Sequence, residues 1–195
     1  MLHTFVAYVE DIPGVLTRVA SLFRRLNINI NSLTVGRSER AGLSRLTLVC
    51  EASAQAGNRI RASLYKLENV VHVDDIAKDP AVTRELALIK VAASPSNRSQ
   101  IFDLVEVFRA RIVDLTSESL MIEMTGVESK IEGLIEVLRE DDGRILEICR
   151  SGKMTMRRGC HVSSVLKAMG AGQEEAPETG AQPEDSLEDA AVEPE

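Results

Sequence analysis

The chain has 195 residues, with 23 Lys and Arg against 30 Asp and Glu, and a formal net charge of −7. Nine acidic residues and no basic ones fall within 171–195, so the other residues carry 23 basic and 21 acidic side chains. A near-neutral body with 2 Tyr, 4 Phe and no Trp gives nucleic-acid binding little support. The segment 171–195 is rich in Glu, Ala, Pro and Gly, which predicts a disordered acidic tail or a simple solubilising extension.

The first half alternates strand and helix patterns. Apolar residues recur at spacings of three and four through the first helix, and strand segments alternate apolar with polar residues. In chain order the predicted elements are strand Thr4–Glu10, helix Gly14–Leu26, a strand near Ile28–Arg37, loop Ser38–Gly42, a strand around Leu46–Cys50, helix Gln55–Leu67 and strand Val70–Ile76. This βαββαβ order predicts a ferredoxin-like antiparallel sheet with two helices on one face.

The second half has a similar rhythm, which predicts a second α/β sandwich domain and an α+β protein overall. Its predicted elements are strand Leu86–Ala92, helix Ser99–Ala110, strands Arg111–Leu115 and Leu120–Thr125, helix Lys130–Leu138 and strand Ile145–Cys149. Each sheet keeps one face without helices. An apolar open face favours association, so we expect a homodimer or a larger assembly.

The turn before the first helix has the features of an anion site. The first N–H groups of a helix lack intrahelical partners and attract a carboxylate. We expect Asp11 to cap this helix, Pro13 to occupy its first turn, and Gly14 to let a ligand approach the backbone. The alternative is a turn and helix cap without a ligand.

Chemistry-bearing residues are scattered. The cysteines form no Cys-x-x-Cys pair and the histidines no local cluster, which predicts no metal site. They are Cys50, Cys149, Cys160, His3, His72 and His161. We expect Cys50 and Cys149 to be small core residues in a reducing cytoplasm. No apolar run reaches membrane-spanning length, and no signal peptide is evident.

No catalytic motif is found either. The chain lacks a Gly-x-Ser-x-Gly elbow, a Walker loop and a Gly-x-Gly-x-x-Gly turn. Acidic residues within 130–142 recur at helix-surface spacings, which indicates a solvated face. We therefore predict a protein that binds and regulates, without a catalytic site of its own.

Three runs of the sequence resemble one known family. Pro13-Gly14-Val15-Leu16-x-Arg18-Val19 and Asn29-Ile30-x-Ser32-Leu33-Thr34-Val35 are similar to the ACT domain of the small, regulatory subunit of acetolactate synthase. Ile145-Leu146-Glu147-x-x-Arg150-Ser151-Gly152-x-x-x-Met156-x-Arg158-Gly159 resembles the C-terminal domain of that subunit. The resemblance covers about residues 2–159. It implies an ACT domain over 1–78, a linker over 79–83 and the C-terminal domain over 84–160.

The resemblance also implies a function. Such subunits bind the large catalytic subunit, which uses thiamine diphosphate and Mg²⁺, so no cofactor is expected in this chain. They raise its activity and confer feedback inhibition by valine, sometimes by leucine or isoleucine. The family binds this effector between two ACT domains of a homodimer. By position, the effector-binding residues are Asp11, Gly14, Val15 and Leu16 of one chain with Asn29 and Ile30 of the other.

The chain departs from the family pattern at three positions. Asp11 stands where the family usually has Asn, Asn27 where it has Gly, and Asn31 where it has an acidic residue. A carboxylate only accepts hydrogen bonds, whereas an amide also donates, so we expect Asp11 to weaken or alter the valine response. Asn27 is expected to adopt a left-handed conformation in place of Gly. A free-standing ACT-type amino-acid sensor and a small enzyme of another type remain as alternative functions.

Overall fold

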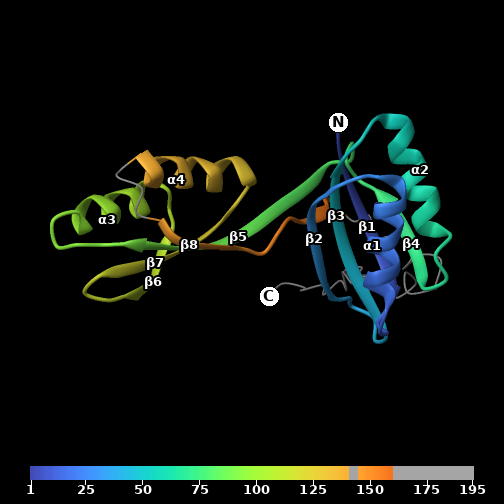
Figure 1. The fold of residues 1–195 in the computed structure, drawn as a ribbon, viewed down its shortest axis with the longest axis horizontal. Helices are drawn as coiled ribbons and strands as arrows, with labels where there is room; N and C mark the ends of the chain where they lie inside the picture. Colours follow the sequence, from blue (N-terminus) through green and yellow to red (C-terminus); the bar gives the residue numbers. More distant parts are fainter. Residues whose placement is uncertain (141–144, 160–195) are drawn as a thin grey trace, which may run out of the picture. The chain divides into compact units, whose positions relative to one another are not determined.

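The computed structural model describes residues 1–140 and 145–159. Figure 1 shows two sheets, each with a pair of helices on one face. The predicted tail, 171–195, lies outside the described residues, as do Cys160 and His161. Within the described part of the chain, no helix is long and apolar enough to cross a membrane.

The N-terminal sheet is antiparallel and has the strand order β2-β3-β1-β4. Its strands and helices are β1 (Leu2–Glu10), α1 (Val15–Leu26), β2 (Ile30–Arg37), β3 (Leu43–Glu51), α2 (Ala54–Tyr65) and β4 (Val70–Asp75). The element order and the single helical layer confirm the predicted ferredoxin-like arrangement.

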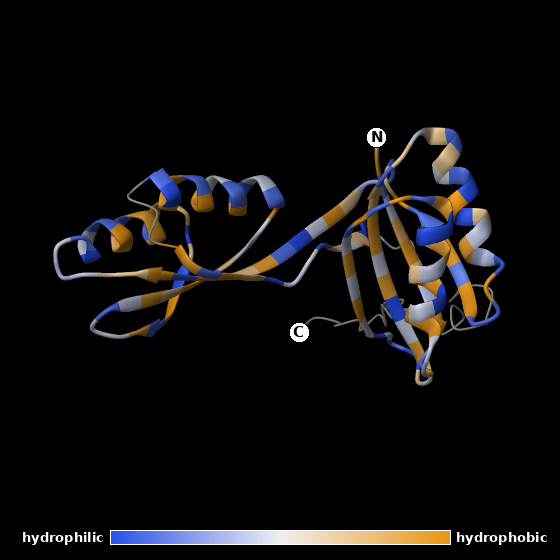
Figure 2. Cartoon of the chain, viewed as in Figure 1, coloured by the Kyte–Doolittle hydropathy of each residue, from blue (hydrophilic) through white to orange (hydrophobic). Residues whose placement is uncertain are grey.

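The core of this half lies between the sheet and its helices. Strand residues that alternate along β1 and β3 meet the apolar stripes of α1 and α2, as the hydropathy colours show (Figure 2). Phe5, Phe23, Leu48, Ile60 and Leu64 are the large residues at its centre, each at most 1% exposed. Each such side chain contributes about 1.5–3 kcal/mol of hydrophobic stabilisation when fully buried.

The second sheet is also antiparallel, with the strand order β6-β7-β5-β8. Its elements are β5 (Ala81–Ala92), α3 (Arg98–Val107), β6 (Arg111–Leu115), β7 (Ser119–Gly126), α4 (Glu128–Glu140) and β8 (Ile145–Arg150). The orange residues of α3 and α4 face the sheet in Figure 2 and form a second core with β5 and β7. The predicted α+β class with two such domains is therefore confirmed.

A short last strand was not predicted from the sequence. β9 (Met154–Arg157) pairs antiparallel with residues 81–84, the first residues of β5. Residues 81–83, which we assigned to a linker, are therefore strand. The pattern Met-Thr-Met-Arg is short and ends on one arginine, so alternation over four positions gave too weak a signal to predict a strand.

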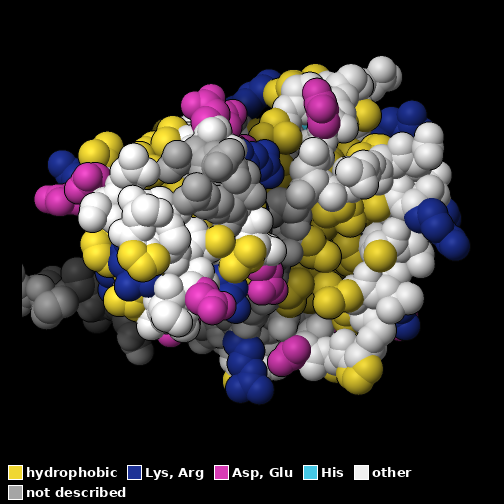
Figure 3. All heavy atoms as spheres, turned by 60° about the vertical axis from the view of Figure 1, so that its left-hand side comes forward, with side chains coloured by type: hydrophobic (Ala, Val, Ile, Leu, Met, Phe, Trp, Pro, Cys, Tyr) yellow, Lys and Arg dark blue, Asp and Glu magenta, His cyan; other side chains and the backbone are white. Residues whose placement is uncertain are grey.

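The helix-free face of the N-terminal sheet is partly covered, whereas we expected an open apolar face. On the face of the N-terminal sheet opposite its helices, Val6, Tyr8 and Val49 are buried. The chain around β9 contacts this face, because Arg45 of β3 donates from Nη2 to the carbonyl oxygen of Thr155 at 2.6 Å. Elsewhere apolar surface remains exposed, and Figure 3 shows hydrophobic side chains gathered over a hollowed area of one face.

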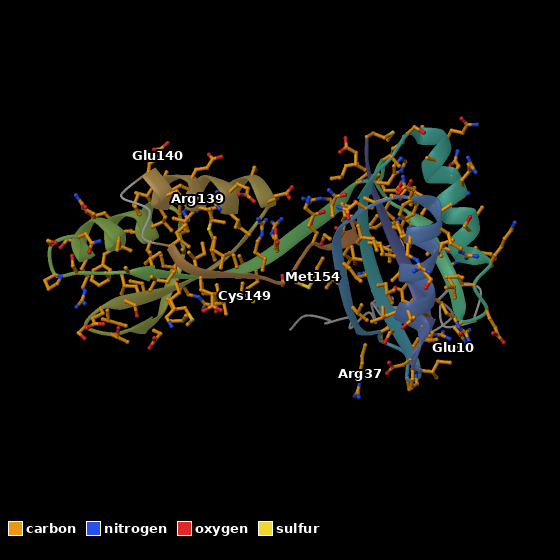
Figure 4. The ribbon with its side chains drawn as sticks, viewed as in Figure 1. Glu10, Arg37, Arg139, Glu140, Cys149 and Met154 are labelled. Carbon is orange, nitrogen blue, oxygen red and sulfur yellow. The ribbon has the colours of Figure 1, made fainter. Side chains whose placement is uncertain are left out.

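The two described cysteines have different environments. Cys50 is fully buried in β3, as predicted, and burial followed by the nearby charge of Asp75 raises the pKa of its thiol. Cys149 is exposed, so its assignment to the core is wrong. Ile148 packs against the second core, and successive strand residues point to opposite faces, which turns Cys149 outward (Figure 4).

Candidate functional site: the two ends of helix α1

The first part of the candidate site is the turn between β1 and α1. Gly14 has φ 89° and ψ −10°, a left-handed conformation that glycine adopts without steric strain. It is the residue immediately before the helix, and its carbonyl oxygen accepts from the backbone N–H of Arg18 at 3.1 Å. The N–H groups of Val15, Leu16 and Thr17 have no intrahelical acceptor, so this end of α1 carries partial positive charge.

Asp11 does not cap the helix, and that prediction is wrong. No side chain makes a capping hydrogen bond, and the residue at the N-cap is Gly14, three residues after Asp11. Pro13 lies in the turn and not in the first helical turn. The carboxylate of Asp11 instead accepts from the hydroxyl of Ser44 on β3 at 3.0 Å, and its backbone N–H donates to the carbonyl of Gly42 at 2.8 Å. Asp11 thus fastens the turn between β1 and α1 to the loop before β3 and to the first residues of that strand.

A polar network holds the same end of α1 and was not foreseen. Arg18 donates to the side chains of Asn69 and Glu68, the latter at 3.1 Å. Asn69, only 9% exposed, donates from Nδ2 to the carboxylate of Glu10 at 2.6 Å. Glu10 is the last residue of β1 (Figure 4), and Asn69 directly precedes β4, so this hydrogen bond joins the two strand ends. Arg18 belongs to the Pro13–Val19 run that resembles the ACT domain, but the sequence around Asn69 gives no sign that the two side chains meet. Their contact depends on the pairing of distant strands.

The second part of the candidate site lies at the other end of α1. Asn27 has φ 55° and ψ 43°, which confirms its predicted left-handed conformation. The backbone N–H of Asn27 donates to the carbonyl of Arg24, and that of Ile28 to the carbonyl of Phe23, each at 3.1 Å. These bonds close the helix. Asn29 follows and is exposed, while Ile30 opens β2 and packs partly against the core.

The six predicted effector-binding residues therefore form two groups within one chain. Asp11, Gly14, Val15 and Leu16 lie at the start of α1, with Leu16 44% exposed. Asn29 and Ile30 lie beyond its end. α1 has 12 residues, so at a rise of about 1.5 Å per residue about 18 Å separates the two groups. A single chain cannot bring both groups to one small amino acid.

The segment after β8 makes a second group of polar contacts, beside β2. The backbone N–H of Lys153 donates to Ser32 Oγ at 2.8 Å, and Thr34 Oγ1 donates to the Lys153 carbonyl at 3.1 Å. Gly152 has φ 79°, and a Cβ there would lie 2.9 Å from Ser32 Oγ. Glycine is therefore required at 152 both for its conformation and for this close approach.

A charged cluster supports this segment from the second sheet. Arg150 donates from Nε and Nη2 to the two carboxylate oxygens of Glu85 at 2.8 and 2.7 Å, and it also contacts Glu132. Glu85 is only 4% exposed. The hydrogen bond to Glu85 is the main reason that the pKa of Arg150 is raised, so the guanidinium stays protonated. Among the described residues, no group of His, Cys, Asp and Glu could hold a metal ion.

The fold and the paired turns at the ends of α1 define a class of protein, the ACT-type regulatory module. Two family models match consecutive parts of the chain. Residues 5–72 match the ACT domain of the acetohydroxyacid synthase small subunit, and residues 84–159 match the model described as the small subunit of acetolactate synthase.

Relatives of the same kind cover most of the described chain. It is 45% identical over 159 residues to a probable acetolactate synthase small subunit of Archaeoglobus fulgidus, covering 82% of this chain and 98% of that one. It is 46% identical over 157 residues to the acetolactate synthase small subunit of Mycolicibacterium smegmatis, covering 80% and 91%. The crystal structure of the Thermotoga maritima small subunit superposes with a TM-score of 0.76 at 39% identity, covering 82% and 98%. The chain belongs to the acetolactate synthase small subunit family.

Proposed function

We propose that this chain activates the catalytic subunit of acetolactate synthase and makes its activity sensitive to inhibition by a branched-chain amino acid, with valine as the expected effector. The observation that carries the proposal is the ordered match of both segments, 5–72 and 84–159, to the small subunit of that enzyme. The chemistry belongs to the partner, which holds thiamine diphosphate and Mg²⁺. The chain itself contributes binding surfaces and an effector site, and it acts in the cytoplasm.

The effector site is proposed to form between two copies of the ACT domain. The start of α1 and the Asn29 turn lie about 18 Å apart in one chain, so a second chain must supply the other half. β2 is an edge strand of the sheet and carries exposed Leu33 and Val35, 39% and 41% exposed. An edge strand with apolar side chains is suited to pairing with its copy.

Each part of a bound amino acid has a partner in this arrangement. The N–H groups after Gly14 receive the carboxylate, because they are unpaired and lie at the positive end of the helix dipole. Asn29 of the second chain orients the α-ammonium through its side-chain oxygen. Leu16 and Ile30 contact the aliphatic side chain. Binding changes activity only if the two arrangements of the dimer differ in affinity for the effector.

Asp11 is proposed to weaken this response. Its carboxylate is held by Ser44 at the same turn that would receive the carboxylate of the effector, so two negative charges compete there. Asparagine at this position would keep an oxygen for Ser44 and remove the charge. We therefore expect Asp11→Asn to tighten valine binding by about tenfold, which corresponds to about 1.4 kcal/mol.

Two measurements test the proposal. The first assays acetolactate formation by the catalytic subunit with and without this chain; activation by the mixture supports the proposal, and turnover by the isolated chain contradicts it. The second titrates the chain with valine, leucine and isoleucine in a calorimeter, using Asp103→Asn on the exposed face of α3 as the charge-matched control. Unchanged valine affinity in Asp11→Asn would show that the charge of Asp11 does not weaken effector binding. Effector binding without activation would indicate a free-standing sensor.

A further inference from the structure

Strand β2 begins at Ile30, directly after Asn29, so half of the proposed effector site lies at its start. The strand is only lightly held within its own sheet. It pairs there with β3, and none of its eight described residues is buried, whereas β1 and β3 each bury five residues in a row. A segment with so little buried surface shifts at a small cost in free energy. A ligand that contacts Asn29 and Ile30 can therefore move β2.

The ladder between β2 and β3 is interrupted close to this half of the site. Ile30 lies opposite Cys50 and Ser32 opposite Val49, so Asn31 is an extra residue, which forms a β-bulge. A bulge disrupts the ladder locally and bends the strand. Asn31 also lines a cavity of about 390 Å³, which gives the start of β2 room to change its course.

Directly after the bulge, β2 is bonded to a segment of the second half of the chain. The backbone N–H of Lys153 donates to Ser32 Oγ at 2.8 Å, and the carbonyl of Lys153 accepts from Thr34 Oγ1 at 3.1 Å. Ser32 and Thr34 are two positions apart, so their side chains lie on the same face of the strand, away from its hydrogen-bonding edge. We call Ser32, Thr34, Gly152 and Lys153 the clamp.

The clamp fits closely, so it responds to small movements of β2. A Cβ at Gly152 would lie 2.9 Å from Ser32 Oγ and 3.1 Å from Thr34 Oγ1, which means that bare backbone contacts both hydroxyl groups. A hydrogen bond is lost when its donor and acceptor are more than about 3.5 Å apart. The bond from Lys153 to Ser32 is 2.8 Å long, so a shift of β2 by roughly 1 Å breaks it.

The clamp is joined to the centre of the second sheet through one continuous strand, β5. Met154, labelled in Figure 4, follows the clamp and begins β9, which pairs with residues 81–84 of β5. β5 then continues through 85–92 between β7 and β8. On the N-terminal side of the clamp, Arg150 binds the buried Glu85 of the same strand at 2.8 and 2.7 Å. A change at the clamp therefore reaches β5 along both flanking segments.

We propose that the clamp holds the effector-free arrangement of β2 and that effector binding opens it. The inference rests on the proposed function, because it needs an amino acid between two copies that contacts Asn29 and Ile30. As the two copies close on the effector, β2 shifts at the bulge and Ser32 moves away from the N–H of Lys153. The second half of the chain thereby loses this attachment to the N-terminal sheet, which gives the catalytic subunit two arrangements to distinguish.

The first test measures effector affinity in the full chain with and without the clamp bond. Ser32→Ala removes the acceptor of the Lys153 N–H, and with it a bond that opposes the bound arrangement. We expect calorimetry to show that valine binds the variant about two- to tenfold more tightly, the range that corresponds to one net hydrogen bond. If Ser32 only stabilised the fold, its replacement would leave the affinity unchanged or weaken it.

Ser53→Ala is the matched control. Ser53 Oγ accepts from the backbone N–H of Ala56 at 3.2 Å at the start of α2, a bond of the same kind that lies outside β2 and the clamp. Its loss should leave the affinity for valine unchanged. Leucine and isoleucine are titrated in parallel, and the amino acid that binds the wild type most tightly is used for the comparison.

The second test follows the clamp bond itself through hydrogen exchange of backbone amides, measured by NMR. The Lys153 amide should exchange faster when the wild-type chain is saturated with that amino acid, because its acceptor has moved away. The Ala56 amide should keep its exchange rate. In Ser32→Ala the Lys153 amide should exchange fast from the outset and respond little to the effector.

Three results would overturn the inference. Equal or weaker effector binding in Ser32→Ala would show that the clamp does not oppose the bound arrangement. An equal gain in Ser53→Ala would show that the effect is not specific to the clamp. A Lys153 amide whose exchange rate falls or stays the same on effector binding would show that the clamp does not open. A wild-type chain that binds none of the three amino acids contradicts the proposed function and this inference with it, whereas binding with an unresponsive clamp contradicts this inference alone.

Discussion

Replacing Gly57 with alanine is expected to destabilise the chain, although alanine is ordinarily the better helix residue by about 0.8–1 kcal/mol. Gly57 lies in α2 against the imidazole of His3, and a Cβ at this position would be 2.6 Å from both ring nitrogens. His3 is only 4% exposed and cannot move freely. Its Nδ1 lies 2.6 Å from an oxygen of Asp75, and its ring stacks on Phe5 with centroids 5.7 Å apart.

The magnitude follows from these contacts. Extra volume in a packed interior costs about 1–3 kcal/mol, and a shift of His3 that breaks its bond to Asp75 costs about 1.5–3 kcal/mol. The two costs together, less the helix-propensity gain, lower the free energy of unfolding by about 1.5–5 kcal/mol. Urea titration followed by circular dichroism measures it as a lower midpoint at constant slope.

A matched control variant is available in the second sheet's helices. At Gly133 in α4 a Cβ would meet only Phe108 Cε1, at an ordinary 3.6 Å, so Gly133→Ala should stabilise the chain by up to about 1 kcal/mol. His3→Ala combined with Gly57→Ala should show a coupling energy of about 1–3 kcal/mol. If Gly57→Ala were as stabilising as Gly133→Ala, the reasoning about His3 would be refuted.

Two other predictions concern the charged cluster and the cysteines. Glu85→Gln should lower the free energy of unfolding, measured by urea titration, by about 1.5–3 kcal/mol, because it leaves the guanidinium of Arg150 without its main partner. The control Glu132→Gln, at the exposed end of the cluster, should change the free energy of unfolding by less than about 1 kcal/mol. Iodoacetamide at pH 8 should alkylate Cys149 readily but Cys50 only after unfolding, because Cys50 is buried and its thiol pKa is raised. Mass spectrometry of the digested chain measures the labelling of both cysteines. Equal labelling of the two would contradict their assignment as exposed and buried.

Local patterns predicted the strand and helix order well because each element buries one face. The stripe of α1 and the alternation of β1 contain enough positions for the period to stand out, so the βαββαβ order could be predicted before the structure. Asn27 was predicted correctly because few residues tolerate its left-handed backbone. These features depend on residues close together in the sequence.

The wrong predictions depend on contacts between distant residues. The carboxylate of Asp11 bonds to Ser44, 33 positions away, so a local capping pattern could not reveal its partner. Cys149 lies in an apolar run, but the face of β8 on which it lies depends on Ile148, which packs against the second core. β9 forms because it pairs with residues 81–84, at least 70 positions earlier. The effector-binding assignments remain predictions, because their two halves belong to different chains in the proposed site.

The return of the chain along β9 has a practical consequence for dissecting this protein. A protein shortened at Lys78 would retain the segment matched by the ACT model but lose Lys153 and Thr155, which bond to Ser32, Thr34 and Arg45. Conversely, a protease nick near Lys78 would leave these bonds in place, and the two pieces would stay associated. The unit that can be exchanged between relatives is therefore discontinuous in sequence, and a hybrid subunit should carry residues 151–157 together with the first 78.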